Sequence, residues 1–200
     1  MNTVICGVSQ RSCKGELICG DVIRTFERAA LYVIAIADGL GHGRHANLAA
    51  TAFCDAVEQA ADISQLEQVI HSANRNLSST RGAAVALVVI DRDKSLLHFV
   101  GIGNIALQSI SQYAIRPISI AGILGRRVRT VKVFSCNIAS NDIIAIYSDG
   151  ISSRFSLSTC IKEISSSLGV KATPQEIADK IVSKHGKDID DASCIVLAIT

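Results

Sequence analysis

Apolar runs of strand length recur along this chain, and two of them end at the same dipeptide, Asp-Gly. These runs, each with its dipeptide, are 31–37 with Asp38-Gly39 and 143–148 with Asp149-Gly150. A third run, 192–199, has the acidic pair Asp190-Asp191 in front of it, so a strand antiparallel to the other two would bring these carboxylates to one edge. Carboxylates gathered in one place repel each other at neutral pH, and a divalent cation with oxygen ligands relieves that repulsion. The sequence therefore predicts a metal site at one sheet edge.

Most of the chain has the pattern of short strands, and helices occur in pairs between groups of strands. The expected strands are 3–8, 16–19, 31–37, 83–90, 95–100, 105–110, 128–134, 143–148 and 193–199. Apolar residues at helical spacing predict helices over about 45–60, 64–77 and 159–168, with a fourth that starts at 173. Short connections between neighbouring strands favour antiparallel pairing. We therefore expect an α+β fold, a four-layer αββα sandwich with two antiparallel sheets flanked by helices, as one domain over residues 1–200.

Two of the expected helices carry a start signal. Ser64 is followed three residues later by Glu67, which is the spacing of a capping box. Thr173 is followed by Pro174 and Glu176, so that Thr can cap the helix, Pro can occupy its first turn and Glu can reach back. Both signals predict helix N-termini at these positions.

Composition and charge exclude several classes of function. The net charge of +2 is close to balanced and the basic residues are scattered, which argues against nucleic-acid or membrane-surface partners. The seven cysteines are odd in number and none has Cys-x-x-Cys spacing, so we interpret them as reduced thiols. The N-terminus lacks a signal-peptide pattern, and no stretch approaches the roughly 18 apolar residues of a membrane helix. We expect a cytoplasmic protein; its oligomeric state stays open.

A fourth acid, Asp21, follows Cys19-Gly20 at the close of another short apolar stretch. Gly39 has no side chain to block its carbonyl, which can therefore approach a metal ion. The loop 38–43 leads directly into an expected helix, where backbone amides can face an anion. Only the fold can unite acids so far apart in the chain.

In this order, five motifs resemble those of PPM-type metal-dependent serine/threonine phosphatases, and most closely the bacterial branch that contains SpoIIE. They are Gly20-Asp21, 38–43 followed by Ala46, 101–104, 141–150 and 190–193. The resemblance spans roughly residues 16–198. It implies hydrolysis of phosphoserine or phosphothreonine on a STAS-domain protein of a bacterial stress-signalling complex, the stressosome.

The resemblance also implies a β-sandwich with two Mn or Mg ions at one edge. Asp38 would bridge both ions, Asp21 and the carbonyl of Gly39 would hold one, and Asp149 and Asp190 would hold the other. Asp191 would support these ligands from outside. Through the metal-bound water, Asp38 and Asp149 would be catalytic, since paired cations lower the pKa of a bridging water and the resulting hydroxide attacks phosphorus.

The chain departs from the family pattern in places. Relatives often carry an Arg before the first acidic motif to grip phosphate, whereas here only Arg11 and Lys14 precede it. Ser193 stands where Thr is common. These differences leave the expected metal ligands intact.

Each of these residues also has a simpler interpretation. Turns favour Asp-Gly for conformational reasons alone. His42 is a candidate general acid or phosphate contact, and equally a partly exposed loop histidine. Asn104 is a candidate substrate contact, and a Gly-Asn turn explains it as well.

Two alternative functions remain open from the sequence. A non-catalytic binding or regulatory module of the same fold could keep the acids without turnover. The glycine loop 39–43 could bind a nucleotide phosphate, but it lacks the Lys-Ser/Thr ending of a P-loop and the rest of a dinucleotide fingerprint.

Overall fold

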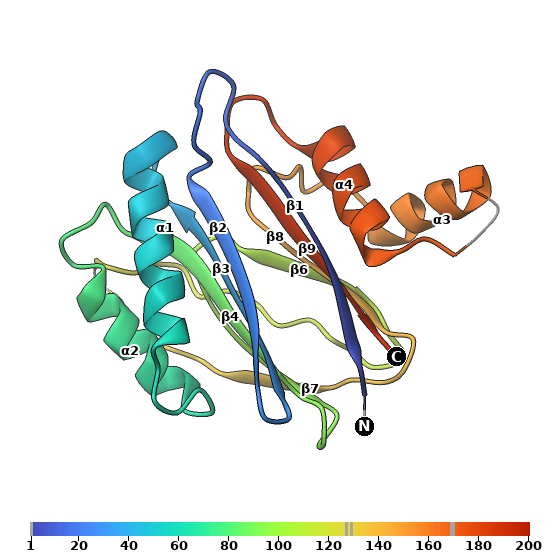
Figure 1. Ribbon diagram of the computed structural model, residues 1–200, viewed down its shortest axis with the longest axis horizontal. Helices are drawn as coiled ribbons and strands as arrows, with labels where there is room; N and C mark the ends of the chain where they lie inside the picture. The colour runs from blue at the N-terminus through green and yellow to red at the C-terminus, as the bar shows by residue number, and fades with distance from the viewer. Residues whose placement is uncertain (1, 127, 129, 169–170) are drawn as a thin grey trace.

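Two antiparallel sheets lie face to face at the centre of the molecule, and helices cover their outer faces (Figure 1). The computed structural model describes residues 2–126, 128, 130–168 and 171–200. One sheet has the strand order β1 (Val4–Arg11), β9 (Ala192–Ile199), β8 (Ile143–Tyr147) and β6 (Ala106–Ile110). The other has the order β2 (Asp21–Arg28), β3 (Leu31–Gly39), β4 (Ala83–Asp91), β5 (Leu96–Ile102) and β7 (Phe134–Asn137). The expected α+β sandwich is confirmed.

Each sheet is covered by its own pair of helices (Figure 1). The helices α1 (Gly43–Glu58) and α2 (Leu66–Asn76) pack on the five-stranded sheet, and α3 (Leu157–Leu168) and α4 (Pro174–His185) pack on the four-stranded sheet. Within the described residues, none of these helices has the length and apolar character to cross a membrane.

The alternation of side chains along β3 explains why this strand is continuously apolar. Val33 and Ala35 pack toward α1 and α2, whereas Ile34 and Ile36 pack between the two sheets. Successive residues of a strand face opposite sides, so a strand that is covered on both sides needs apolar residues at every position. Burial on both faces fixes β3 firmly, and its end therefore provides a rigid base for Asp38.

The strand predictions were right for the strongly apolar runs and wrong at two places. Residues 16–19 form no strand; the strand begins at Asp21 instead and continues to Arg28 as β2. Arg24 in the middle of β2 hides this strand from a search for apolar alternation, and it forms an ion pair with Asp55 of α1. A strand was also expected over 128–134, but β7 begins only at Phe134, and residue 129 of that range lies outside the described residues.

One of the two predicted helix starts is wrong. Ser64 does not cap α2, because the helix begins at Leu66 with Gln65 as its N-cap. The Ser64 hydroxyl donates instead to Asp62 Oδ1, at 2.6 Å. At α4 the prediction is confirmed, since Thr173 and Glu176 form a reciprocal capping box with Pro174 in the first turn.

Candidate active site

The acids that are far apart in the sequence meet at one edge of the sandwich. Asp21 begins β2 and is paired directly opposite Asp38 near the end of β3. Asp149 follows β8 and Asp190 precedes β9, and because these strands are antiparallel neighbours, both acids lie at the same end of their sheet. The structure therefore brings together the four acids that the sequence predicted as metal ligands. They interact electrostatically, with Asp38 at the centre of the group.

A cavity of about 460 Å³ opens over this group. Its lining includes three of the acids, the loop before α1, Asn104 and a segment between β6 and β7. The lining residues are Asp38, Leu40, Gly41, His42, Ala84, Gly103, Asn104, Ala121, Gly122, Ile123, Asp149 and Asp190. Asp21 lies beneath this surface and is only 2% exposed. Among the described residues that line the cavity there is no lysine or arginine.

Burial and mutual repulsion shift the pKa values of these carboxyl groups upward. Burial, followed by the charges of Asp21 and Asp149, raises the pKa of Asp38 to about 9. Burial also raises the pKa of Asp21 to about 6, although hydrogen bonds from two serines oppose that shift. The pKa of Asp190 is raised by burial and by the charge of Asp149. Such a group of carboxylates is unstable as a set of anions unless positive charge is placed among them.

Two serines bind Asp21 from the opposite sheet. The Ser193 hydroxyl of β9 donates to Asp21 Oδ2 at 2.7 Å, and the Ser148 hydroxyl lies 3.2 Å from that of Ser193. Ser148 and Ser193 are both fully buried. Ser148 was not predicted from the sequence, where its only signal is its position directly before Asp149 at the end of an apolar run.

Asp149 is held on two sides. The side-chain amide of Asn104 donates to Asp149 Oδ2 at 2.6 Å, and the Lys187 ammonium group donates to the backbone carbonyl of Asp149. Asn104 is therefore more than a turn residue, because it fixes one oxygen of a candidate ligand. Lys187 was not identified from the sequence, where an isolated lysine in a polar segment gives no signal.

Asp191, which the resemblance places outside the metal ligands, anchors the loop between β1 and β2. Its Oδ1 accepts a hydrogen bond from the backbone amide of Cys13 at 2.9 Å, and Asp191 is 2% exposed. All seven cysteines, Cys13 included, are free thiols.

The donor set fits a hard divalent cation, although the carboxylates also interact with one another and with neighbouring polar side chains. Within the described residues, no three acidic, histidine or cysteine side chains form a ready ligand cluster. Asp38 is instead hydrogen-bonded with Asp149. Two buried carboxylate oxygens, Asp21 Oδ1 and Asp191 Oδ2, have no hydrogen-bond partner among the described residues. Buried oxygens without partners, beside carboxyl groups with raised pKa values, are the donors that such a cation prefers.

The glycines of the two Asp-Gly dipeptides are needed for close packing. A Cβ atom on Gly39 would lie 1.9 Å from the backbone oxygen of Ala46 in α1. A Cβ atom on Gly150 would lie 1.8 Å from the backbone oxygen of Asp191. Real side chains essentially never approach backbone so closely, so only glycine lets α1 and the start of β9 pack against the strand ends.

The remaining candidates from the sequence lie at the rim of the site or outside it. His42 lines the cavity and is the N-cap residue of α1, but its side chain is 58% exposed and its Nδ1 lies 2.6 Å from Glu16 Oε1. Arg11 forms an ion pair with Asp188 at 3.3 Å, and the Lys14 amide donates to the carbonyl of Asp188. Neither Arg11 nor Lys14 is part of the described cavity lining.

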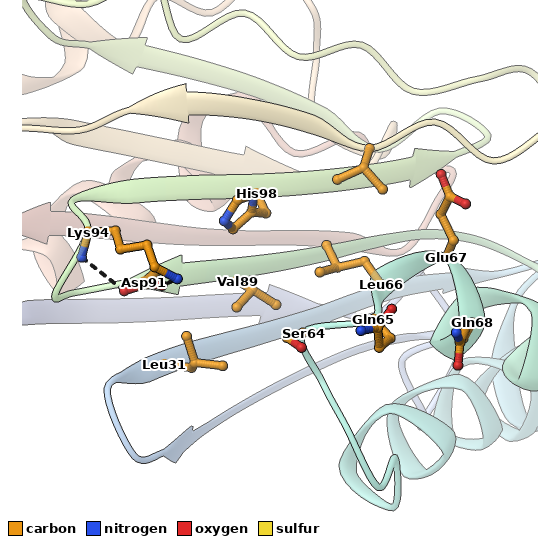
Figure 2. A pocket seen from close by; sticks show the side chains of 11 residues that line it. Leu31, Ser64, Gln65, Leu66, Glu67, Gln68, Val89, Asp91, Lys94 and His98 are labelled. Atoms are coloured by element: carbon orange, nitrogen blue, oxygen red, sulfur yellow. Dashed lines mark hydrogen bonds and ion pairs between the residues drawn. The ribbon is translucent and has the colours of Figure 1, made fainter.

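Another cavity, of about 440 Å³, lies between the start of α2 and the five-stranded sheet (Figure 2). Its one acid from the sheet, Asp91, forms an ion pair with Lys94 at 2.9 Å, as Figure 2 shows. Leu66 and Val89 contribute apolar surface to its lining. Because Asp91 already has a cationic partner and Glu67 is the only other acid in the described lining, this cavity lacks the group of carboxylates found at the sandwich edge.

Comparison with known proteins agrees with this geometry. Residues 29–200 match the family model of Stage II sporulation protein E (SpoIIE). The phosphoserine phosphatase RsbX of Bacillus subtilis (strain 168) is 27% identical over 176 residues, which cover 84% of this chain and 88% of RsbX. A chain from structural work on the bacterial stressosome superposes with a TM-score of 0.88 at 27% identity, over 98% of this chain and 99% of the other. RsbX crystallised with magnesium superposes with a TM-score of 0.83 at 23% identity, over 98% of this chain and 96% of the other. The chain belongs to the SpoIIE family of PPM-type phosphatases.

Proposed function

We propose that this protein is a metal-dependent protein phosphatase that hydrolyses phosphoserine and phosphothreonine in the bacterial cytoplasm. The proposal extends to a single catalytic domain over residues 1–200 that uses two Mn²⁺ or Mg²⁺ ions. The observation that carries it is the position of Asp38, which is largely buried among Asp21, Asp149 and Asp190 and has a pKa of about 9. A buried group of acids that repel one another costs folding free energy unless cations bind among them.

The ligands follow from the placement of the acids. Asp38 interacts with Asp21 of its own sheet and with Asp149 and Asp190 of the other sheet, so it is the candidate to bridge both ions. Asp21 and the carbonyl of Gly39 would hold one ion, and Asp149 and Asp190 would hold the other. When bound, such ions supply an activated water nucleophile and offset the charge on phosphate oxygens.

The residues around the ligands have separate tasks. Hydrogen bonds from Ser193 and Ser148 favour the charged form of Asp21, which is the form that binds a cation. Asn104 fixes the orientation of Asp149, since a hydrogen bond to one oxygen limits rotation of the carboxylate. His42, at the rim, is placed where it could donate a proton or contact a phosphate, and its bond with Glu16 would orient its ring.

The substrate we propose is a phosphorylated STAS-domain protein of the stressosome. The similarity to RsbX, a phosphoserine phosphatase, supports a phosphoprotein as substrate. The similarity to a chain from stressosome work supports the signalling context. The cavity over the acids, of about 460 Å³, has room for a phosphorylated side chain presented on a protein surface.

The test is phosphate release from a phosphorylated STAS-domain protein with Mn²⁺, with and without chelator. Asp38→Ala and Asp149→Ala should abolish release, because each removes a proposed metal ligand. Asp93→Ala is the matched control, since Asp93 is an exposed aspartate in the turn between β4 and β5, at the other end of β4 from Ala83 beside the site. Equal release by all four proteins, or release that survives the chelator, would rule out the proposal.

The rival function is a non-catalytic binding or regulatory module. The observation in its favour is that no three acidic, histidine or cysteine side chains of the described residues form a ready ligand cluster. Calorimetric titration with Mn²⁺ separates the two. Binding without turnover of any phosphoprotein would favour the module.

A further inference from the structure

The cavity over the acids, here called the first cavity, adjoins a smaller one of about 320 Å³, which we call the second cavity. The two cavities share Asn104 and Asp149 in their linings, so a ligand could extend from one into the other past these residues. The first cavity is lined by Asp38, Asp149 and Asp190, whereas the second is lined by Asp149 together with two cations, Arg154 and Lys187. An acidic cavity that would hold cations therefore lies beside a basic one.

The two cations are held in place by backbone contacts between their segments. Ile151 and Gly186 form an antiparallel bridge, and the Lys187 amide donates to the carbonyl of Gly150 at 2.8 Å. The Ser152 amide donates to the carbonyl of His185 at 2.9 Å. The segment that carries Arg154 is thus attached to the segment that carries Lys187, and the cavity between them is preformed.

Neither cation forms an ion pair in the described part of the chain, although the charge of Lys187 acts on the carboxylate of Asp190. Arg154 is exposed and has no ion pair there. Lys187 is also exposed, and its ammonium group donates to the backbone carbonyl of Asp149. The hydroxyl groups of Ser152 and Ser153 add further hydrogen-bonding capacity to the lining. This chemistry suits an anion that arrives from outside.

We propose that the second cavity binds an anionic group of the phosphoprotein substrate, on a residue one or two positions from the phosphoserine. This inference rests on the proposed function and names its substrate class: phosphoserine with an acidic neighbour. In an extended chain, residues one and two positions away lie about 3.3 and 7 Å along the backbone, which suits two cavities with a common wall. A carboxylate of Asp or Glu is the expected group, and a second phosphate offers the same chemistry.

The experiment measures equilibrium binding, which does not depend on turnover. Fluorescein-labelled peptides carry a non-hydrolysable phosphonate analogue of phosphoserine, and fluorescence anisotropy with Mg²⁺ gives their Kd. The series places Ala, Glu, Lys or a second phosphoserine analogue one or two positions away, on either side. We expect Glu on one side to lower the Kd about two- to fivefold for each ion pair relative to Ala, and this difference should shrink with added salt. The phosphoserine arm shows whether the cavity prefers phosphate to carboxylate.

Variants assign the preference to the cavity. Arg154→Ala should remove most of the difference between the Glu and Ala peptides, and Arg154→Lys should restore it. Arg154→Glu should instead favour the Lys peptide, an outcome that loss of folding cannot produce. Arg75→Ala is the matched control: Arg75 is exposed on α2, which packs on the other sheet, and this variant should keep the wild-type preference.

Failure of this inference differs from failure of the proposed function. Hydrolysis of para-nitrophenyl phosphate by wild type with Mn²⁺ tests the phosphatase itself, because this substrate has no neighbouring residue. Hydrolysis together with equal Kd values for the Glu and Ala peptides overturns only the inference. A preference that persists in Arg154→Ala, or no binding of any peptide, overturns it as well. A preference lost in Arg154→Ala without any hydrolysis supports the anionic subsite and contradicts the phosphatase.

Discussion

Ser193 of the four-stranded sheet donates a hydrogen bond of 2.7 Å to Asp21 of the five-stranded sheet. The two residues are 172 positions apart, and the bond crosses the buried interior at the edge that carries the acids. Both side chains are almost completely buried. The bond therefore stabilises the sandwich and favours the charged form of a candidate metal ligand against the effect of burial.

Ser193→Ala should lower the free energy of unfolding by about 1–3 kcal/mol, because it leaves a buried carboxylate oxygen without its donor. Asp21 Oδ1 already has no hydrogen-bond partner among the described residues, so losing the bond that Oδ2 accepts from Ser193 should be costly. Urea unfolding measures the change. Ser183→Ala, which removes an exposed hydroxyl on α4, should change stability by less than about 0.5 kcal/mol. Equal effects of both variants would show that the bond across the sandwich contributes little.

Gly39→Ala should destabilise the protein by about 3 kcal/mol, because the added methyl group meets the backbone of α1 at Ala46. A helix backbone cannot move aside without disturbing the packing of α1 on β3. The control is Gly122→Ala, whose new Cβ atom would meet only the side chain of Ile102, at 3.2 Å. Thermal unfolding of both variants is the measurement. If Gly39→Ala melts at the wild-type temperature, the close approach of α1 to the strand end is wrong.

Without divalent cations, the protein should become less stable as the pH rises. The pKa values of Asp38, about 9, and Asp21, about 6, lie above the ordinary value of 3.8 that these groups have when unfolded. Between about pH 4 and pH 9 the folded state therefore holds protons that the unfolded state has released, so each increase in pH favours unfolding. In chelator, Tm should fall across this range.

Two further measurements isolate the cause. Asp38→Asn cannot ionise, so its Tm should fall less between about pH 6 and pH 9 than that of wild type. Adding Mn²⁺ should raise the Tm of wild type more at about pH 8.5 than at pH 6, since cations bind the ionised carboxylates. A Tm that rises with pH in chelator would contradict the raised pKa values.

The sequence alone predicted the elements whose burial leaves a pattern. β3 was found because both of its faces are covered, so its residues are apolar at every position. β2 was missed because it lies at the edge of its sheet, where Arg24 and Arg28 reach toward α1 and the segment after it. Polar side chains at such an edge carry no periodic signal.

The same limit applies to the candidate site. Asp38 and Asp149 could be predicted because each ends an apolar run. The opposition of Asp21 and Asp38 depends on the register of a hairpin that was not predicted, and the bond from Ser193 to Asp21 depends on how two sheets stack. Contacts of this kind follow from tertiary packing, so local patterns contain no information about them.

Asn104→Ala should weaken the binding of Mn²⁺ by about tenfold, because Asn104 orients a carboxylate that we propose as a ligand. The Asn104 amide lies 2.6 Å from Asp149 Oδ2, and without it the carboxylate must give up rotational freedom when it binds an ion. Calorimetric titration of the metal-free protein gives the affinity directly. Asn76→Ala, at the exposed end of α2, is the matched control and should bind Mn²⁺ as wild type does. Equal affinities for wild type and Asn104→Ala would mean that Asp149 needs no help to reach its position, or that it does not bind the metal.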